Sequence, residues 1–265
     1  MSSGMRVERR GREAWLTLSR PDVRNALDDR LIAALLSEAR ALAIDPMVDV
    51  VVLAGDGPAF CAGADLAWMR RMRDYDEARN LADATVVADL FHALASLPMP
   101  LVARVHGAAL GGGAGLLAIS DVAVAADDVL VGFTEARVGI LPATIAPYVI
   151  RRIGLAAART AFLRAHRFSA DDAGAIGLVD DVCPAGGLDA RLRERLDEIA
   201  MGASSAHRAT KRLLAELAPL PTADERRATA QAIARQRVSD DGQEGLNAFL
   251  ERRAPRWQRP EPSGA

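Results

Sequence analysis

A run of three glycines at residues 111–113 limits most strongly what this chain can fold into. It follows an apolar run that begins after Pro100 and precedes a second apolar run that ends at Asp121. This pattern predicts a buried strand, a glycine turn and then a helix over residues 116–120. Glycines let the backbone approach a ligand closely, and the helix start offers unpaired N–H groups. The stretch therefore predicts a site for an anion or for a developing oxyanion.

Apolar periodicity divides the rest of the chain into strands and helices. Strands are expected in short apolar or β-branched runs at residues 6–10, 14–19, 48–54, 121–126, 129–133 and 178–182. Asp28 is expected to cap a helix that ends before Pro46, and Ser204 and Ser205 to start a later one. Further helices are expected after residue 66 and at residues 76–97, 143–153, 156–164, 170–176, 188–201, 205–217, 224–238 and 243–252.

Alternation of strands and helices predicts an α/β fold with a mostly parallel sheet. Half of the 265 residues are hydrophobic and only 4% are aromatic, as expected where helices cover a sheet on both faces. The pattern becomes mainly helical after residue 156. We therefore predict a core over residues 1–202 and a helical region over residues 203–265.

Charge and cysteine content exclude several classes of protein. A formal net charge of −2 provides no overall basic field for nucleic acid or anionic lipid. The two cysteines, Cys61 and Cys183, and a polar start predict a reducing, cytoplasmic location rather than a secreted disulfide scaffold. The longest apolar run is interrupted by Arg104 and His106, so no membrane span is expected. No spaced set of Cys and His ligands predicts a metal site.

The glycine turn does not match the common nucleotide-binding motifs. A dinucleotide fingerprint needs a third glycine where Leu116 stands, and a Walker loop needs a Lys followed by Ser or Thr where Ala114 and Gly115 stand. The chain also has no G-x-S-x-G or H-E-x-x-H motif. His106 is more typical of a packed, hydrogen-bonded histidine than of a base, and Cys61 of a small buried side chain than of a nucleophile.

Glu135 is the acidic residue with the strongest positional signal. It follows the expected strand at residues 129–133 and precedes a loop that contains Gly139 and Pro142. Ligands meet α/β sheets at such strand ends. The pattern alone is slightly more typical of a solvated loop acid than of a catalytic one, and both interpretations stay open at this point.

Three motifs together resemble the enoyl-CoA hydratase/isomerase (crotonase) superfamily. They are Phe60-Cys-Ala-Gly-Ala-Asp-Leu66, His106-Gly-Ala-Ala-Leu-Gly-Gly-Gly113 and Phe133-Thr-Glu-Ala-Arg-Val-Gly-Ile-Leu-Pro142. The resemblance covers nearly the whole chain, and residues 141–148 and 242–257 look most like methylglutaconyl-CoA hydratases. It implies a spiral of ββα units followed by a C-terminal helical trimerisation region. A homotrimer or a dimer of trimers is the implied assembly.

The resemblance also implies a mechanism and a set of site residues. The substrate would be an acyl-CoA thioester, with coenzyme A part of the substrate and no separate cofactor. Backbone N–H groups of Ala64 and Gly112 would hold the thioester oxygen, and Glu135 would exchange a proton with the substrate. Residues that match the substrate-binding positions are Arg24, Ala26, Ala62, Asp65, Leu66, Gly111, Gly115 and Pro142.

One departure from the family pattern concerns Gly115, because many hydratases carry a second, water-activating glutamate there. Its absence leaves two catalytic hypotheses: a hydratase acting on a branched or carboxylated 2-enoyl-CoA, and an enoyl-CoA isomerase with a single glutamate. The methylglutaconyl-type similarity favours the hydratase. A noncatalytic member that binds CoA esters or RNA is a third hypothesis, against which the retained Glu135 and the balanced charge count.

Overall fold

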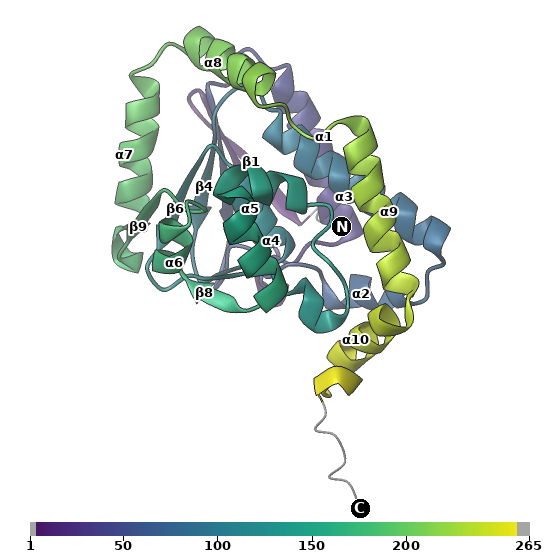
Figure 1. Cartoon of the computed structure of the whole chain (residues 1–265). Helices are drawn as coiled ribbons and strands as arrows, with labels where there is room; N and C mark the ends of the chain where they lie inside the picture. The colour runs from purple at the N-terminus through teal and green to yellow at the C-terminus, as the bar shows by residue number, and fades with distance from the viewer. Residues whose placement is uncertain (1–3, 259–265) are drawn as a thin grey trace, which may run out of the picture.

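A sheet of six strands forms the centre of the structure, a computed structural model that describes residues 4–258 (Figure 1). The strands pair in the order β1-β2-β3-β4-β6-β9, antiparallel between β1 and β2 and parallel elsewhere. The predicted α/β class and mostly parallel sheet are confirmed. The strands are β1 (Met5–Arg10), β2 (Glu13–Leu18), β3 (Val50–Gly55), β4 (Leu101–Val105), β6 (Val122–Ala126) and β9 (Asp181–Cys183).

A smaller sheet of three strands lies beside the glycine turn. It contains β5 (Ala108–Leu110), β7 (Leu130–Gly132) and β8 (Arg167–Ser169), with β7 in the middle. The sequence pattern did not predict β5, which lies directly before the glycine turn, or β8, which lies between two expected helices. This sheet carries both the glycine turn after β5 and the loop after β7 that begins with Glu135.

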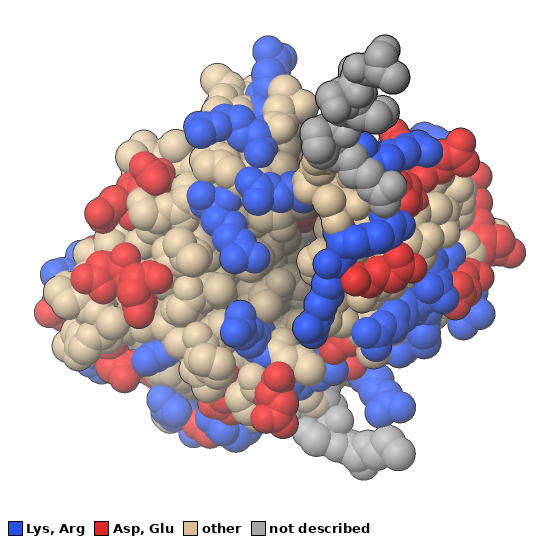
Figure 2. Space-filling view, turned by 90° about the horizontal axis from the view of Figure 1, so that it is seen from below, with Lys and Arg blue, Asp and Glu red and all other residues tan. Residues whose placement is uncertain are grey.

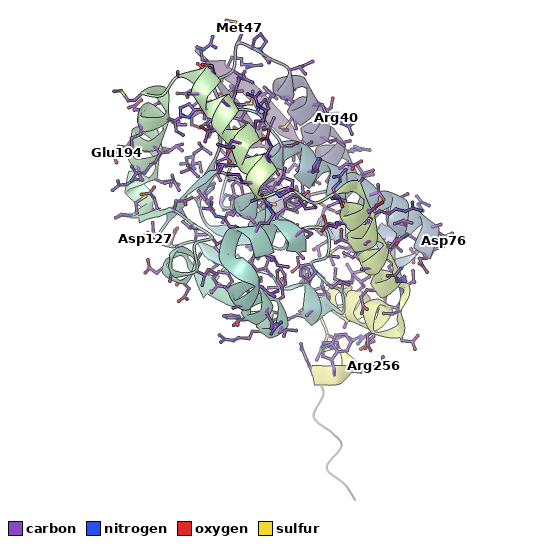
Figure 3. The ribbon with its side chains drawn as sticks, turned by 45° about the horizontal axis from the view of Figure 1, so that its top comes forward. Arg40, Met47, Asp76, Asp127, Glu194 and Arg256 are labelled. Atoms are coloured by element: carbon purple, nitrogen blue, oxygen red, sulfur yellow. The ribbon has the colours of Figure 1, made fainter. Side chains whose placement is uncertain are left out.

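Helices pack around both sheets. The longer ones lie close to their expected positions: α1 (Asp29–Ala43), α2 (Leu66–Arg73), α3 (Glu77–Ala95), α5 (Ala146–Arg164), α6 (Ala170–Ala175), α7 (Leu188–Ala200), α8 (Ser204–Leu217), α9 (Ala223–Val238) and α10 (Asp240–Leu250). The expected cap is present on α1, where the Asp28 carboxylate accepts the Leu31 N–H at 2.8 Å. Apolar residues such as Leu31 and Leu35 on α1 are fully buried, whereas the labelled side chains of Arg40, Asp76 and Glu194 lie at the periphery (Figure 3).

Two predicted helix boundaries were wrong. Helix α4 (Gly112–Ala118) begins four residues earlier than expected, because the glycines adopt helical geometry themselves. The N-cap of α8 is Ala203 rather than a serine, and it makes no side-chain cap bond. The expected division into two helices near Gly154 is confirmed, because the backbone within α5 is non-helical at this glycine, with φ of 76°.

The C-terminal helices return to the core. Helix α9 packs along α3, and α10 packs against α2 and the short 3-10 helix η2 (Glu135–Val138), as Figure 1 shows. The division at residue 202 and the trimer stay predictions.

Candidate active site

The two glycine-containing turns lie side by side. Cys61 N–H donates to the Ala108 carbonyl and Leu110 N–H donates to the Cys61 carbonyl, each at 3.0 Å. A Cβ atom on Gly63, whose φ is +94°, would lie 2.9 Å from the Leu110 oxygen. Only glycine combines this backbone conformation with so close an approach, so the turns need it there.

Two backbone N–H groups at these turns have no hydrogen-bond partner among residues 4–258. One belongs to Gly112, the first residue of α4, which lies too early for an intrahelical bond. The other belongs to Ala64. Its neighbours are both bonded to Leu27, which donates to the Gly63 carbonyl at 2.7 Å and accepts from Asp65 N–H at 2.9 Å. Bonding directions alternate along an extended chain, so the Ala64 N–H is turned away from Leu27.

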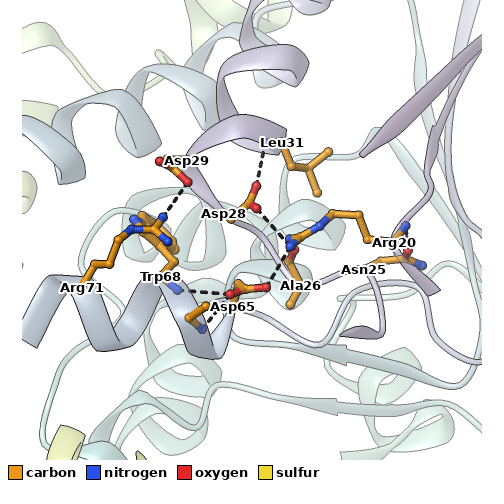
Figure 4. Close-up of polar contacts among 10 residues, drawn as sticks. Arg20, Asn25, Ala26, Asp28, Asp29, Leu31, Asp65, Trp68 and Arg71 are labelled. Carbon is orange, nitrogen blue, oxygen red and sulfur yellow. Dashed lines mark hydrogen bonds and ion pairs between the residues drawn. The ribbon is translucent and has the colours of Figure 1, made fainter. Parts of the chain in front are cut away.

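A buried polar network holds the Ala64 turn in place (Figure 4). The Asp65 carboxylate caps α2 by accepting from Ala67 N–H at 2.7 Å and from Trp68 N–H at 3.1 Å. Its other oxygen pairs with Arg20 at 2.9 Å, and the same guanidinium pairs with Asp28 at 3.0 Å. Asp65 is 5% exposed, so its side chain positions the turn. The substrate contact expected at Asp65 stays a prediction.

A cavity of about 90 Å³ brings the predicted catalytic residues together. Ala64, Gly112, Glu135 and Pro142 all line it. The remaining wall is mainly apolar and comes from α1, α3, α9 and the segments around them: Leu27, Ile32, Trp68, Val87, Phe91, Ile140, Leu141, Thr144, Ile145, Ile233 and Arg237. Residues far apart in sequence therefore converge on one mainly apolar space.

Glu135 presents a desolvated carboxyl group to this cavity. Its Oε2 atom is buried and has no hydrogen-bond partner within the described chain. Its Oε1 atom lies 3.3 Å from the point where a Cβ on Gly111 would stand, which places the carboxyl group beside the glycine turn. Burial raises the pKa of Glu135 from 4.5 to about 7. Such a group can both accept and donate a proton near neutral pH.

The structure leaves no space for a side chain at Gly115, the position where many hydratases carry a second glutamate. A Cβ on Gly115 would lie 2.5 Å from the Ile145 methyl group Cγ2 and 3.0 Å from the Phe91 ring. Phe91 and Ile145 line the cavity, whereas Gly115 lies behind them and does not. This wall is therefore apolar where a two-carboxylate site would carry its second acid.

Several predicted substrate-binding residues do not line the cavity. Arg24, Ala26, Ala62, Leu66 and Gly111 lie on the two turns or on the segment next to them. Arg24 is exposed, and its carbonyl accepts from Ala62 N–H at 3.0 Å. Ala26 is buried, and its carbonyl accepts from the Arg20 guanidinium. Their expected contacts with coenzyme A stay predictions.

The surroundings of His106 and Cys61 favour a structural role for both side chains. The His106 ring contacts the Gly57 carbonyl at 2.8 Å and is not part of the cavity. Cys61 is fully buried, and burial raises the pKa of its thiol to about 12, so it stays protonated. Both agree with the interpretation preferred from the sequence.

Sequence reasoning missed the polar side chains Trp68, Thr144 and Arg237 in the cavity wall. For Arg237 a signal was available. It continues the buried face of α9 formed by Ala230 and Ile233, at the spacing of an apolar stripe. A charged residue on a buried helix face is unusual and therefore marks a candidate binding residue.

Lys and Arg side chains border a hollow on the face of the molecule seen in Figure 2. Within residues 4–258 there is no cluster of His, Cys, Asp and Glu able to hold a metal ion, and none of the helices is long and apolar enough to span a membrane.

Comparison with known proteins identifies relatives along nearly the whole chain. The family model for enoyl-CoA hydratase/isomerase matches residues 11–260. The 2,3-dehydroadipyl-CoA hydratase of Escherichia coli is 32% identical over 250 residues, which are 94% of this chain and 96% of that protein. A crystal structure of an enoyl-CoA hydratase from Mycobacterium avium has 32% identity and a TM-score of 0.82, covering 97% of this chain and all of the other. One from Shewanella pealeana has 35% identity and a TM-score of 0.78, covering 96% of each chain.

Proposed function

The chain belongs to the enoyl-CoA hydratase/isomerase family, and we propose that it adds water across the double bond of a short 2-enoyl-CoA thioester. The observation that carries this proposal is the convergence of Ala64, Gly112 and Glu135 on one cavity. Two unpaired N–H donors and one desolvated carboxyl group are the parts that enolate chemistry needs.

The backbone donors stabilise the charge that develops during addition. Water attacks the β carbon of the enoyl group, the double-bond electrons move toward the thioester, and its oxygen becomes an enolate oxygen. The N–H groups of Ala64 and Gly112 donate hydrogen bonds to that oxygen. Preorganised donors of this kind each contribute roughly 10²–10³ in rate.

Glu135 carries the protons. As a carboxylate it accepts the proton that the attacking water loses, and it then donates a proton to the α carbon as the enolate collapses. The net change is the addition of one water, with oxygen at the β carbon and hydrogen at the α carbon. A pKa of about 7 suits both steps, because neither protonation state is strongly favoured near neutral pH.

A 3-enoyl to 2-enoyl isomerase is the alternative, and the closed position at Gly115 is the observation that favours it. Isomerisation needs only one group to move a proton between two carbons. Phe91 and Ile145 leave no second carboxylate to orient water. Hydration is preferred because the relatives compared above are named hydratases, including one with a carboxylated acyl group.

The size of the cavity supports a short acyl group. The cavity measures only about 90 Å³, well below the roughly 300–1,000 Å³ of sites that hold drug-sized ligands. A branched or carboxylated acyl group of that size fits the proposal. The step uses only the thioester and water, so we propose no separate cofactor, and we propose a cytoplasmic location.

An assay against a panel of CoA esters tests the proposal. The purified chain is mixed with straight, branched and carboxylated 2-enoyl esters and with matching 3-enoyl esters, and the products are identified by mass. Formation of a 3-hydroxyacyl-CoA from a 2-enoyl ester supports hydration. Turnover restricted to 3-enoyl esters would replace it with isomerisation.

A further inference from the structure

Arg237 places a positive charge in the wall of the proposed catalytic cavity. It lies on α9 and is only 6% exposed. Arginine normally extends its charged end into water, and an arginine that is buried this fully needs anionic or hydrogen-bonding partners. Its position among apolar wall residues therefore calls for an explanation.

The partners that the chain supplies do not satisfy this guanidinium. Its Nη1 atom lies 3.4 Å from the Asn80 side-chain oxygen and 3.5 Å from an Asp83 oxygen, both longer than usual for a charged hydrogen bond. Its Nε atom is buried without a partner in the described residues, as is the Trp68 indole nitrogen. The Nε donor of this guanidinium is therefore unused within residues 4–258.

Two ion pairs elsewhere in this chain have a different geometry. Arg195 contacts both oxygens of Asp181, at 2.6 Å and 2.8 Å, and Arg253 contacts both oxygens of Glu244, at 2.7 Å and 2.9 Å. Those pairs have the two-point geometry that arginine and a carboxylate prefer. Arg237 lacks such a partner within residues 4–258.

We propose that Arg237 binds a carboxylate at the end of the acyl group, so that the substrate is the CoA mono-thioester of a short unsaturated dicarboxylic acid. This inference rests on the hydration activity proposed above. A carboxylate taken into an apolar cavity is strongly disfavoured unless it is paired there. The planar guanidinium provides two parallel N–H donors for that pairing.

The same arrangement selects against uncharged acyl groups. An alkyl tail of equal length would fill the cavity but leave the buried guanidinium without its anion. A site built for a polar partner rejects analogues that lack it more strongly than an apolar pocket rejects a change of size. Burial raises the pKa of the neighbouring Asp83, and the positive charge of Arg237 opposes that rise.

A matched pair of substrates tests the proposal in the full-length protein. The esters 2-hexenedioyl-CoA and 2-hexenoyl-CoA differ only in a terminal carboxylate or methyl group. The readout is the ratio of their kcat/KM values, measured for the wild type, Arg237→Met and Arg237→Lys. The wild-type ratio is expected to exceed ten, and Arg237→Met is expected to lower it roughly 10- to 100-fold. Arg237→Lys, which keeps charge but loses the two-point geometry, should give an intermediate ratio.

Asp83→Asn is the matched control, because it also changes the charge of this buried cluster. Its ratio of kcat/KM values for the two esters is expected not to fall, because the Asp83 carboxylate competes with the substrate carboxylate for Arg237. A wild-type ratio near one, or an unchanged ratio in Arg237→Met, would overturn the proposal. If Arg237→Met does not fold, the wild type is assayed with hexenedioyl-CoA and with its neutral terminal amide. A preference for the carboxylate supports the proposal, and equal kcat/KM values would overturn it. Turnover of 2-hexenoyl-CoA by the wild type supports hydration even if Arg237 has no such role.

Discussion

Replacing the proposed catalytic acid is expected to stabilise the fold while it removes most of the activity. Burial raises the pKa of Glu135 from 4.5 to about 7, so the folded chain binds this proton more tightly than the unfolded chain does. At about 1.4 kcal/mol per pH unit, the difference corresponds to about 3 kcal/mol. Glu135→Gln keeps the shape of the side chain but has no charge to bury.

The sign of the effect follows from the two protonation equilibria. Below about pH 4.5 both states carry the proton, and the carboxyl group costs nothing. Between about pH 4.5 and 7 the unfolded chain loses its proton first, so the free energy of unfolding falls as pH rises. Above about pH 7 both states are ionised, and the wild type retains a constant loss of about 3 kcal/mol.

Urea unfolding at pH 5 and pH 8 measures this difference. Protein concentration is held constant, because the stability of an oligomer depends on it. Glu135→Gln is expected to exceed the wild type by about 1 kcal/mol at pH 5 and about 3 kcal/mol at pH 8. Its kcat should fall by roughly 10²–10⁴ with little change in CoA-ester binding.

The control is Glu216→Gln on the exposed surface of α8. Its stability difference from the wild type should be small and the same at both pH values. An equal stability difference for Glu135→Gln at pH 5 and pH 8 would refute the desolvated carboxyl group. Near-native turnover of Glu135→Gln would refute its catalytic role.

Three further predictions concern the other parts of the site and the assembly. Ala64→Pro removes one oxyanion donor and should abolish turnover, whereas a folded, near-native variant would remove Ala64 from the mechanism. Gly115→Glu, whose Cβ would contact Ile145 at 2.5 Å, should destabilise the fold and not raise kcat; a more active hydratase would contradict the closed wall. Exposed apolar side chains on α8, among them Leu214 at 56% and Leu217 at 72%, predict a homotrimer or hexamer in sedimentation experiments, and a stable monomer at micromolar concentration would contradict it.

Local signals in the sequence were enough to predict the strands, helix starts and turns around the site. Buried strands such as β3 read as continuous apolar runs, and Asp28 marked the start of α1 as a side-chain cap. The glycines at 111–113 marked the turn that leads into α4. These features depend on neighbours in the chain, so periodicity and turn chemistry reveal them.

The walls of the cavity depend on contacts between distant segments. Nothing near Gly115 in sequence shows that Phe91 and Ile145 occupy the space of a side chain there. Whether Glu135 is solvated or buried is decided by helices that pack on its loop, and the pattern alone left that question open. Arg237 lies 102 positions after Glu135, and only the return of α9 to the core brings it to the cavity.

The central claim is that Glu135 alone, with the two backbone donors, adds solvent oxygen to an enoyl thioester. Turnover of a 2-enoyl-CoA in ¹⁸O-labelled water tests this most directly, with the product analysed by mass spectrometry. One labelled oxygen is expected in a 3-hydroxyacyl-CoA product from the wild type and almost none from Glu135→Gln. Conversion of a 3-enoyl ester to its 2-enoyl isomer, with no label incorporated from any 2-enoyl substrate, would contradict it.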